Sequence, residues 1–256
     1  MPTQLGPNGN EGNVLIGMVL LKDDQSLQSE LFLKDLKEQN SLKIEKIGIA
    51  NGAIVMEIDG ESVSIMSLAM PVPWGDIEST AAYAYNWETA VEDLEEHKGH
   101  IIVSVMYGVN NTIKRFQILT TVICSLLRTS NAIGVYKGTQ CLLIPKDEYL
   151  SEAREMSADN LPLNLWIYFG LLRDNDHNSG YTLGLSEFGK KELEVVGSEN
   201  RLSDIKIFLF NIAHALIELD VTFRDGQTFE YSEWGTIKIS LSKGHYIENE
   251  TFKLEF

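Results

Sequence analysis

The sequence predicts an α+β fold with a mixed, largely antiparallel sheet or sheets and helices packed on one face. Three observations lead to this prediction. Hydrophobic residues make up 44% of the 256 residues, enough apolar surface to offset the loss of chain entropy on folding. Short Ile- and Val-rich runs separated by Asn-Gly and Asp-Gly pairs indicate β-hairpins. Longer segments with apolar residues three and four positions apart indicate amphipathic helices between them.

The length is compatible with one large domain. We expect a single α+β domain over residues 14–256, with a possible weak boundary in the polar stretch at 157–162. Residues 1–13 are rich in Gly and Asn and contain no Lys or Arg. They therefore predict a disordered lead and not a signal peptide.

The first predicted elements are a buried strand over 14–21 and a helix. The strand is a continuous apolar run, and Asp23, Asp24 and Ser26 are residues typical of a helix start. Four leucines then place apolar groups near one face of this helix: Leu27, Leu31, Leu33 and Leu36.

A three-stranded antiparallel meander is predicted within residues 43–70. Its strands are Lys43–Ala50, Ala53–Ile58 and Ser62–Met70. The intervening pairs Asn51-Gly52 and Asp59-Gly60 suit the left-handed positions of two-residue type I′ turns.

The segment from Pro71 to Trp87 is predicted to leave the sheet. Pro71 and Pro73 each lack a backbone donor, so this stretch cannot continue inside a sheet. Asp76 is a typical helix cap. Residues 88–98 then predict a helix with acidic residues on its outer side.

The remaining chain alternates between strands and helices. We expect strands at 101–107, 132–136, 141–144, 192–196 and 236–241, a hairpin of 163–172 with 179–185, and helices at 110–128, at 146–156 and from Ser203 onward.

Charge and composition limit the function. The chain has 21 Lys and Arg against 37 Asp and Glu, a net charge of −16. Such a surface disfavours nucleic acids and anionic lipids and favours a basic protein partner. The longest apolar stretch, 118–127, is too short to cross a membrane. Cys124 and Cys141 are too few for a secreted disulfide framework. The sequence therefore predicts a cytoplasmic location, and no cofactor is predicted.

Several short motifs follow one another in a recognisable order. They are Met70-Pro71-Val72-Pro73-Trp74-Gly75-Asp76, Trp87, His97-Lys98-Gly99-His100, Gly134-Val135-Tyr136, Leu163-Asn164-Leu165-Trp166, Tyr181-Thr182-Leu183-Gly184 and Glu192-Leu193-Glu194-Val195. Together they resemble the bacterial domain-of-unknown-function family catalogued as 4261, over roughly Val14 to the C-terminus. The resemblance implies a bacterial cytoplasmic protein and assigns no catalytic residue.

One group of residues suits catalysis. Asp76, Glu78, His97 and His100 are side chains that bind zinc or exchange protons. Their spacing does not match a known metalloprotease motif. Capping and packing are the alternative roles, because a histidine at a helix C-terminus interacts well with the helix dipole.

Four aromatic residues suit binding. Trp74, Tyr83, Tyr85 and Trp87 could line a groove, since aromatic rings give large rigid contacts. They could also close the core over a sheet edge.

The leading hypothesis is a non-enzymatic interaction protein, for example an immunity-type protein that neutralises a basic toxin. The alternative is a metal-dependent hydrolase with a site near Asp76, Glu78, His97 and His100. A homodimer formed through an exposed strand of the meander is a third possibility.

Overall fold

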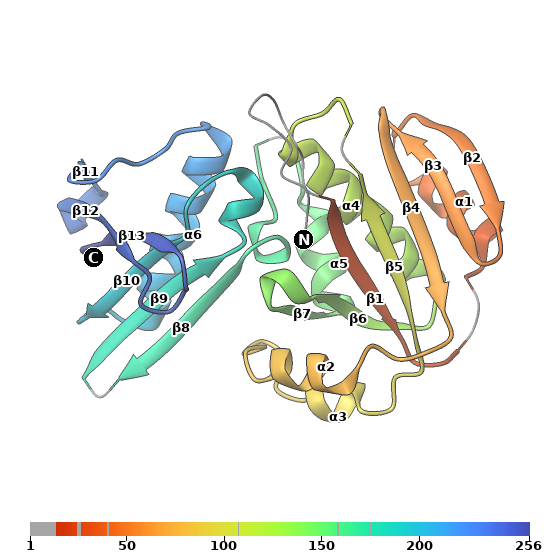
Figure 1. The fold of residues 1–256 in the computed structure, drawn as a ribbon, viewed down its shortest axis with the longest axis horizontal. Coiled ribbons are helices and arrows are strands. Elements are labelled where there is room, and N and C mark those ends of the chain that lie inside the picture. The colour runs from red at the N-terminus through yellow and green to blue at the C-terminus, as the bar shows by residue number, and fades with distance from the viewer. Residues whose placement is uncertain (1–13, 25–26, 40, 107, 158, 175) are drawn as a thin grey trace, which may run out of the picture.

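The computed structural model describes residues 14–24, 27–39, 41–106, 108–157, 159–174 and 176–256. The predicted disordered lead, 1–13, and Ser26 lie outside the described residues. The described chain forms two sheets with helices packed against them (Figure 1). Nearly all strand pairs are antiparallel, so the predicted α+β class is confirmed.

The first sheet has seven strands in the order β2-β3-β4-β5-β1-β6-β7. Every pair of neighbours in it is antiparallel. The strands are β1 (Leu15–Leu21), β2 (Ile44–Ala50), β3 (Ala53–Ile58), β4 (Glu61–Leu68), β5 (Gly99–Val105), β6 (Ala132–Lys137) and β7 (Leu142–Pro145). A short 3₁₀ turn, η1 (Gly138–Gln140), joins the last two.

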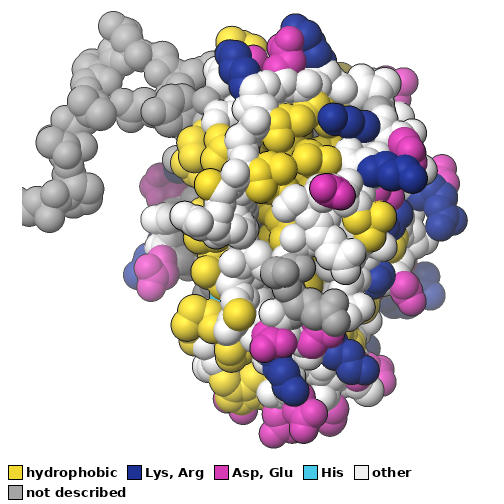
Figure 2. Space-filling view, turned by 90° about the vertical axis from the view of Figure 1, so that its right-hand side faces the viewer, with side chains coloured by type: hydrophobic (Ala, Val, Ile, Leu, Met, Phe, Trp, Pro, Cys, Tyr) yellow, Lys and Arg dark blue, Asp and Glu magenta, His cyan; other side chains and the backbone are white. Residues whose placement is uncertain are grey.

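The predicted meander is strands β2, β3 and β4. Asn51 and Gly52 have φ of 49° and 77°, and Asp59 and Gly60 have 50° and 87°. These left-handed values are the ones that type I′ turns require. Edge strand β2 leaves Ile49 53% exposed, and Figure 2 shows apolar side chains gathered on the side of the molecule that carries β2 and β3.

Three helices cover one face of this sheet: α1 (Ser29–Glu38), α4 (Thr112–Thr129) and α5 (Lys146–Arg154). In α1 the buried residues are Phe32 and Leu36, whereas Leu31, expected on the inner face, is 45% exposed. Helix α4 begins after Asn111, whose side chain accepts a hydrogen bond from the backbone N–H of Lys114.

Two short helices lie on the opposite face of the sheet, whereas the sequence predicted helices on one face only. They are α2 (Trp74–Ala81) and α3 (Ala90–Leu94). Side chains of a strand alternate between faces. Accordingly Val19 and Leu21 join the main core, while Leu20 between them joins a second cluster that includes buried residues of this segment.

The second sheet has six strands in the order β11-β12-β13-β10-β9-β8, and α6 (Leu202–Glu218) packs on it. The strands are β8 (Tyr168–Asp174), β9 (His177–Leu183), β10 (Leu193–Ser198), β11 (Thr228–Glu230), β12 (Thr236–Lys243) and β13 (Glu250–Leu254). Three further 3₁₀ turns are η2 (Leu163–Leu165), η3 (Leu185–Phe188) and η4 (Ser232–Trp234). The final strand, β13, pairs parallel with β10. Ser203 does not cap α6, because the helix already starts at Leu202.

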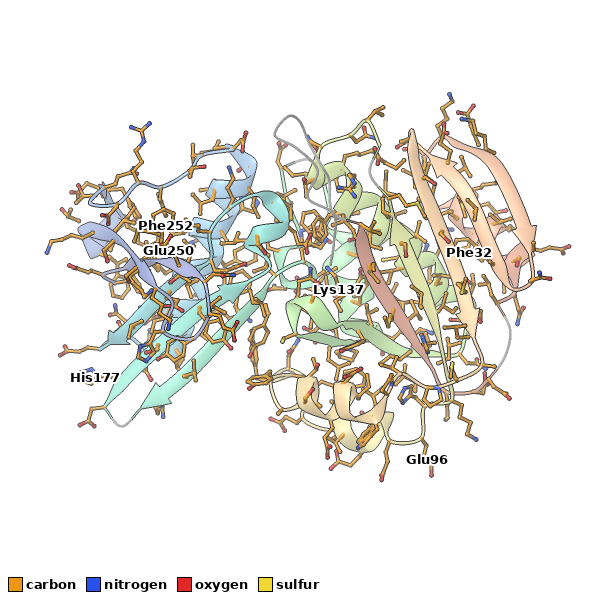
Figure 3. The ribbon with its side chains drawn as sticks, in the orientation of Figure 1. Phe32, Glu96, Lys137, His177, Glu250 and Phe252 are labelled. Atoms are coloured by element: carbon orange, nitrogen blue, oxygen red, sulfur yellow. The ribbon has the colours of Figure 1, made fainter. Side chains whose placement is uncertain are left out.

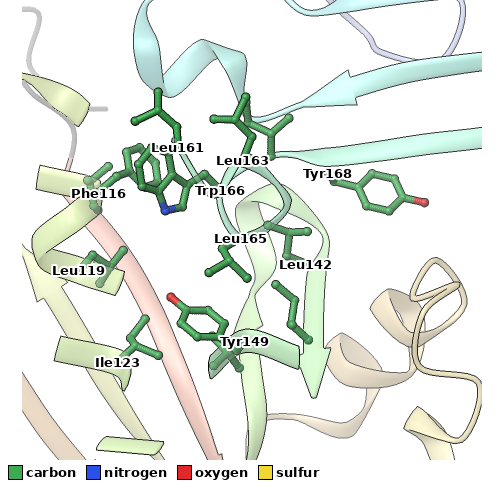
Figure 4. Packing of buried hydrophobic residues seen from close by; sticks show 14 of the residues in the cluster. Phe116, Leu119, Ile123, Leu142, Tyr149, Leu161, Leu163, Leu165, Trp166 and Tyr168 are labelled. Carbon is green, nitrogen blue, oxygen red and sulfur yellow. The ribbon is translucent and has the colours of Figure 1, made fainter. Parts of the chain in front are cut away.

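One hydrophobic core runs through both sheets. Trp166 lies at the junction, between α4 and the second sheet (Figure 4). Its ring centroid is 5.2 Å from that of Phe116, and its indole N–H donates to the hydroxyl of Thr120 at 2.9 Å. The polar stretch 157–162 lies where the chain passes from the first sheet to the second. Among the helices built from described residues, none is long and apolar enough to cross a membrane.

Candidate interaction surface

Five tyrosines form a continuous series of ring contacts between the two sheets, which we call the tyrosine row. The row consists of Tyr83, Tyr85, Tyr168, Tyr181 and Tyr246. The ring centroid of Tyr168 lies 6.3 Å from those of both Tyr83 and Tyr85 and 6.0 Å from that of Tyr181. Tyr181 in turn stacks on Tyr246 at 5.4 Å.

The register of the β8–β9 hairpin places two of these rings side by side. Gly170 is directly opposite Tyr181, and Tyr168 is two residues before Gly170. The two tyrosines are therefore diagonal neighbours on one face of the sheet. Gly170 leaves the room for this arrangement, because a Cβ there would lie 2.2 Å from the Tyr181 ring. Position 180 faces the opposite side of the sheet, and a Cβ at Gly180 would meet the side chain of Ile205 in α6. The tyrosine row therefore lies on the face that α6 leaves free.

Glu194 positions the end of the row. It is directly opposite Tyr181 on β10 and is fully buried. Its carboxylate accepts hydrogen bonds from the backbone N–H groups of His245, Tyr246 and Ile247, and from Lys253. This holds the β12–β13 loop over β9 and β10 (Figure 1). Burial alone would raise the pKa of Glu194, but these hydrogen bonds outweigh it and lower the pKa.

The α2–α3 segment supplies the other end. Tyr83 and Tyr85 follow α2 and are 51% and 47% exposed. The ring of Tyr168 points toward this segment (Figure 4). Beside the three rings is a cavity of about 100 Å³ that is also lined by Glu148, Glu152 and other residues.

Charged groups surround this cavity. Glu148 accepts a hydrogen bond from Asn86, and Glu152 accepts one from Asn164 at 3.1 Å. The ammonium of Lys206 lies 5.1 Å from the centroid of the Tyr85 ring. The Tyr85 ring thus already has a cation of the chain itself, Lys206, near its face. The carboxylates of Glu148 and Glu152 line the same cavity.

Two hydroxyl groups of the row, those of Tyr168 and Tyr181, have raised pKa values. Burial raises the pKa of Tyr168, and the neighbouring Tyr181 and Tyr85 raise it further. Burial also raises the pKa of Tyr181, with Tyr83 adding to the effect. Both phenols therefore remain available as hydrogen-bond donors.

The structure separates the four predicted aromatic residues into two pairs. Tyr83 and Tyr85 lie in the tyrosine row. Trp87 is 7% exposed, donates its indole N–H to Asp93 at 2.7 Å, and lies against Gly134 of β6. Trp74 is partly buried against the same second cluster. The two tryptophans therefore attach the segment to the sheet, and the two tyrosines extend from it.

His97 and His100 attach the proline segment to the sheet through backbone hydrogen bonds. Nε2 of His97 accepts from the Val72 N–H at 3.0 Å, and Nδ1 donates to the Leu94 carbonyl at 2.7 Å. Nδ1 of His100 donates to the Met70 carbonyl at 2.8 Å. Both ring nitrogens of His97 are thus occupied, Nε2 as an acceptor and Nδ1 as a donor.

Asp76 and Glu78 are exposed on α2. Asp76 does not occupy the cap position, because α2 starts two residues earlier, at Trp74. In the first turn its carboxylate still interacts favourably with the helix dipole. Within the described residues, no group of three or more His, Cys, Asp or Glu side chains could hold a metal ion.

Sequence reasoning missed Tyr168, Tyr181 and Tyr246. A signal for the first two exists, since a hairpin register that places Gly170 opposite Tyr181 brings Tyr168 alongside. No local signal places Tyr246, because its position depends on Glu194, about fifty residues earlier in the chain.

A family model described as a domain of unknown function, DUF4261, matches residues 181–255. The resemblance predicted from the sequence motifs is confirmed over this range, which contains Tyr181, Glu194 and Tyr246. No curated protein and no solved structure matches the chain.

Proposed function

We propose that the protein is a non-enzymatic interaction protein. The family that residues 181–255 match is one of unknown function. The tyrosine row, with Glu148 and Glu152, binds a cationic segment of a basic protein. The observation that carries this proposal is the pairing of exposed tyrosine rings with two carboxylates at one cavity. Arginine and lysine side chains are attracted to both kinds of group.

The overall charge supports the same partner. A net charge of −16 accelerates the encounter with a basic protein. Added salt weakens this attraction. The tyrosine rings determine where the basic partner binds, because charge alone would attract cations to the whole surface.

A cytoplasmic location is part of the proposal. Cys124 and Cys141 are both free thiols, as is usual in a reducing compartment. Burial raises the pKa of Cys124 to about 12, so this thiol is unreactive at neutral pH. A bacterial origin stays a prediction from the family resemblance.

The proposal is tested with a fluorescein-labelled peptide of alternating arginine and glycine, titrated with the full chain and followed by anisotropy. We expect Glu148→Gln with Glu152→Gln to weaken binding about tenfold, the loss of about 1.4 kcal/mol. The matched control is Glu30→Gln with Glu38→Gln on α1, which removes the same charge from exposed positions elsewhere.

The control pair should bind the peptide as the unchanged protein does. Equal weakening in both variants would mean that the peptide senses only net charge, and would contradict a defined site.

A further inference from the structure

The molecule contains a second feature that the proposed interaction does not use, the buried lysine at the end of β6. The side chain of Lys137 lies between the two sheets (Figure 3) and is 3% exposed. Its ammonium lies 4.7 Å from the centroid of the Phe116 ring. The hydrogen bond it donates to the Leu165 carbonyl is long, at 3.4 Å. Lysines are almost never buried in this way without a partner or a role.

Lys137 lines a cavity of about 60 Å³ between the sheets. Apolar side chains from β1 and α4 form one wall, and Thr139, Gln140 and Glu187 form the polar part. One carboxylate oxygen of Glu187 is buried and has no hydrogen-bond partner within the described residues. The other accepts from the Gln140 amide at 3.4 Å. The cavity thus joins an amine to an unsatisfied carboxylate.

This cavity adjoins a larger one of about 560 Å³. Leu15 and Glu187 line both cavities, so Glu187 borders the larger cavity as well as the smaller one that contains the amine.

We propose that Lys137 is a reactive amine that forms an imine with a small, largely apolar aldehyde or ketone, with Glu187 as the proton-transfer group. The amine nitrogen attacks the carbonyl carbon, and the π electron pair moves to the oxygen. The Glu187 carboxylate takes one proton from the nitrogen and passes it to this oxygen, which gives a carbinolamine. The carboxylate then moves the second nitrogen proton to the hydroxyl, which leaves as water while the nitrogen lone pair forms the C=N bond, so one water is released for each imine.

The protonation state of the lysine supports this chemistry. Burial lowers the pKa of Lys137 to about 7, against an opposing effect of the Glu187 charge. About half of the amine is then unprotonated at neutral pH, compared with roughly one part in 2,500 for an ordinary lysine. Only the unprotonated amine attacks a carbonyl.

The test uses acetaldehyde and sodium cyanoborohydride with the full chain at neutral pH, and peptide mass spectrometry to follow ethylation of each lysine. We expect Lys137 to be ethylated at least tenfold faster than exposed lysines such as Lys34 and Lys238. Its rate should level off above about pH 7, while the rates at exposed lysines keep rising toward pH 10. An unmodified Lys137 in a folded chain whose exposed lysines are ethylated would overturn the proposal.

Glu187→Gln distinguishes proton transfer from a mere charge effect. Removing the charge alone would lower the lysine pKa further and speed the reaction, whereas losing the proton-transfer group should slow ethylation of Lys137 about tenfold or more. Faster ethylation in this variant would overturn the role of Glu187. Glu30→Gln, at an exposed position on α1, is the matched control and should leave the rate at Lys137 unchanged. Peptide binding at the tyrosine row is measured separately, so either proposal can fail alone.

Discussion

The rings of Tyr83 and Tyr168 meet edge to face, with centroids 6.3 Å apart and planes at 77°. Tyr83 belongs to the segment that joins β4 to β5 in the first sheet, and Tyr168 is the first residue of β8 in the second. Edge-to-face pairs of this kind stabilise by about 0.5–1.5 kcal/mol beyond their buried area. The candidate surface is therefore composite, and it depends on contacts from both sheets.

Gly170→Ala should disturb the packing of Tyr181 in the tyrosine row. The added methyl group would lie 2.2 Å from the Tyr181 ring, so the ring must shift from its present position beside Tyr168. We expect a loss of about 1–3 kcal/mol in the free energy of unfolding, as for other overpacked sites. Urea denaturation measures this loss, and the same variant should bind the basic peptide more weakly.

Gly75→Ala is the control for that experiment. Gly75 lies in α2, and a Cβ there has no atom within 4 Å. Alanine favours a helix over glycine by up to about 1 kcal/mol. Stability should therefore stay the same or rise. Equal destabilisation by both substitutions would show that the close approach of Tyr181 to Gly170 does not affect the free energy of unfolding.

His97→Ala should destabilise the protein through the proline segment. It leaves the N–H of Val72 without its acceptor and removes the donor to the Leu94 carbonyl. An unsatisfied buried group costs about 1–3 kcal/mol. Thermal unfolding followed by circular dichroism measures the difference. His177→Ala, at the exposed first residue of β9, should change stability by less than about 0.5 kcal/mol.

Part of this architecture could be predicted from the sequence because it depends on local chemistry. Asn51-Gly52 and Asp59-Gly60 place positive φ values where a meander needs them. The two prolines take the chain out of the sheet after β4. Neither signal requires knowledge of distant residues.

The rest depends on long-range pairing. The central place of β1, between β5 and β6, and the parallel pairing of β13 with β10 join segments far apart in the chain. The same limit applies to the site. The sequence predicts Tyr83 and Tyr85 because they lie in one short segment rich in aromatic residues, whereas the position of Tyr246 in the row depends on Glu194.

Glu194→Gln should show the pH dependence of the loop contact. Its pKa is lowered in the folded chain from an ordinary value of 4.5. The charged form therefore contributes stability above that value, and the contribution is lost as pH falls through the lower folded pKa. We expect the variant to be less stable by about 2 kcal/mol at neutral pH, from the hydrogen bonds made by the charged group.

Urea denaturation over a range of pH checks this expectation. The difference between the two proteins should shrink once the pH falls below 4.5. Glu255→Gln is the matched control, since Glu255 is an exposed partner of Lys238. It should cost no more than about 1 kcal/mol at any pH. A Glu194→Gln penalty that stays constant into acid would contradict a charged, loop-holding carboxylate.

Binding at the tyrosine row is tested most directly by hydrogen-exchange mass spectrometry with and without the arginine-glycine peptide. We predict slower amide exchange in residues 82–87 and 244–247, unchanged exchange in α1, and loss of this protection in Tyr83→Ala with Tyr85→Ala. Trp234→Ala, which removes an exposed ring elsewhere, should keep it. Protection confined to other segments, or none with saturating peptide, would contradict the account.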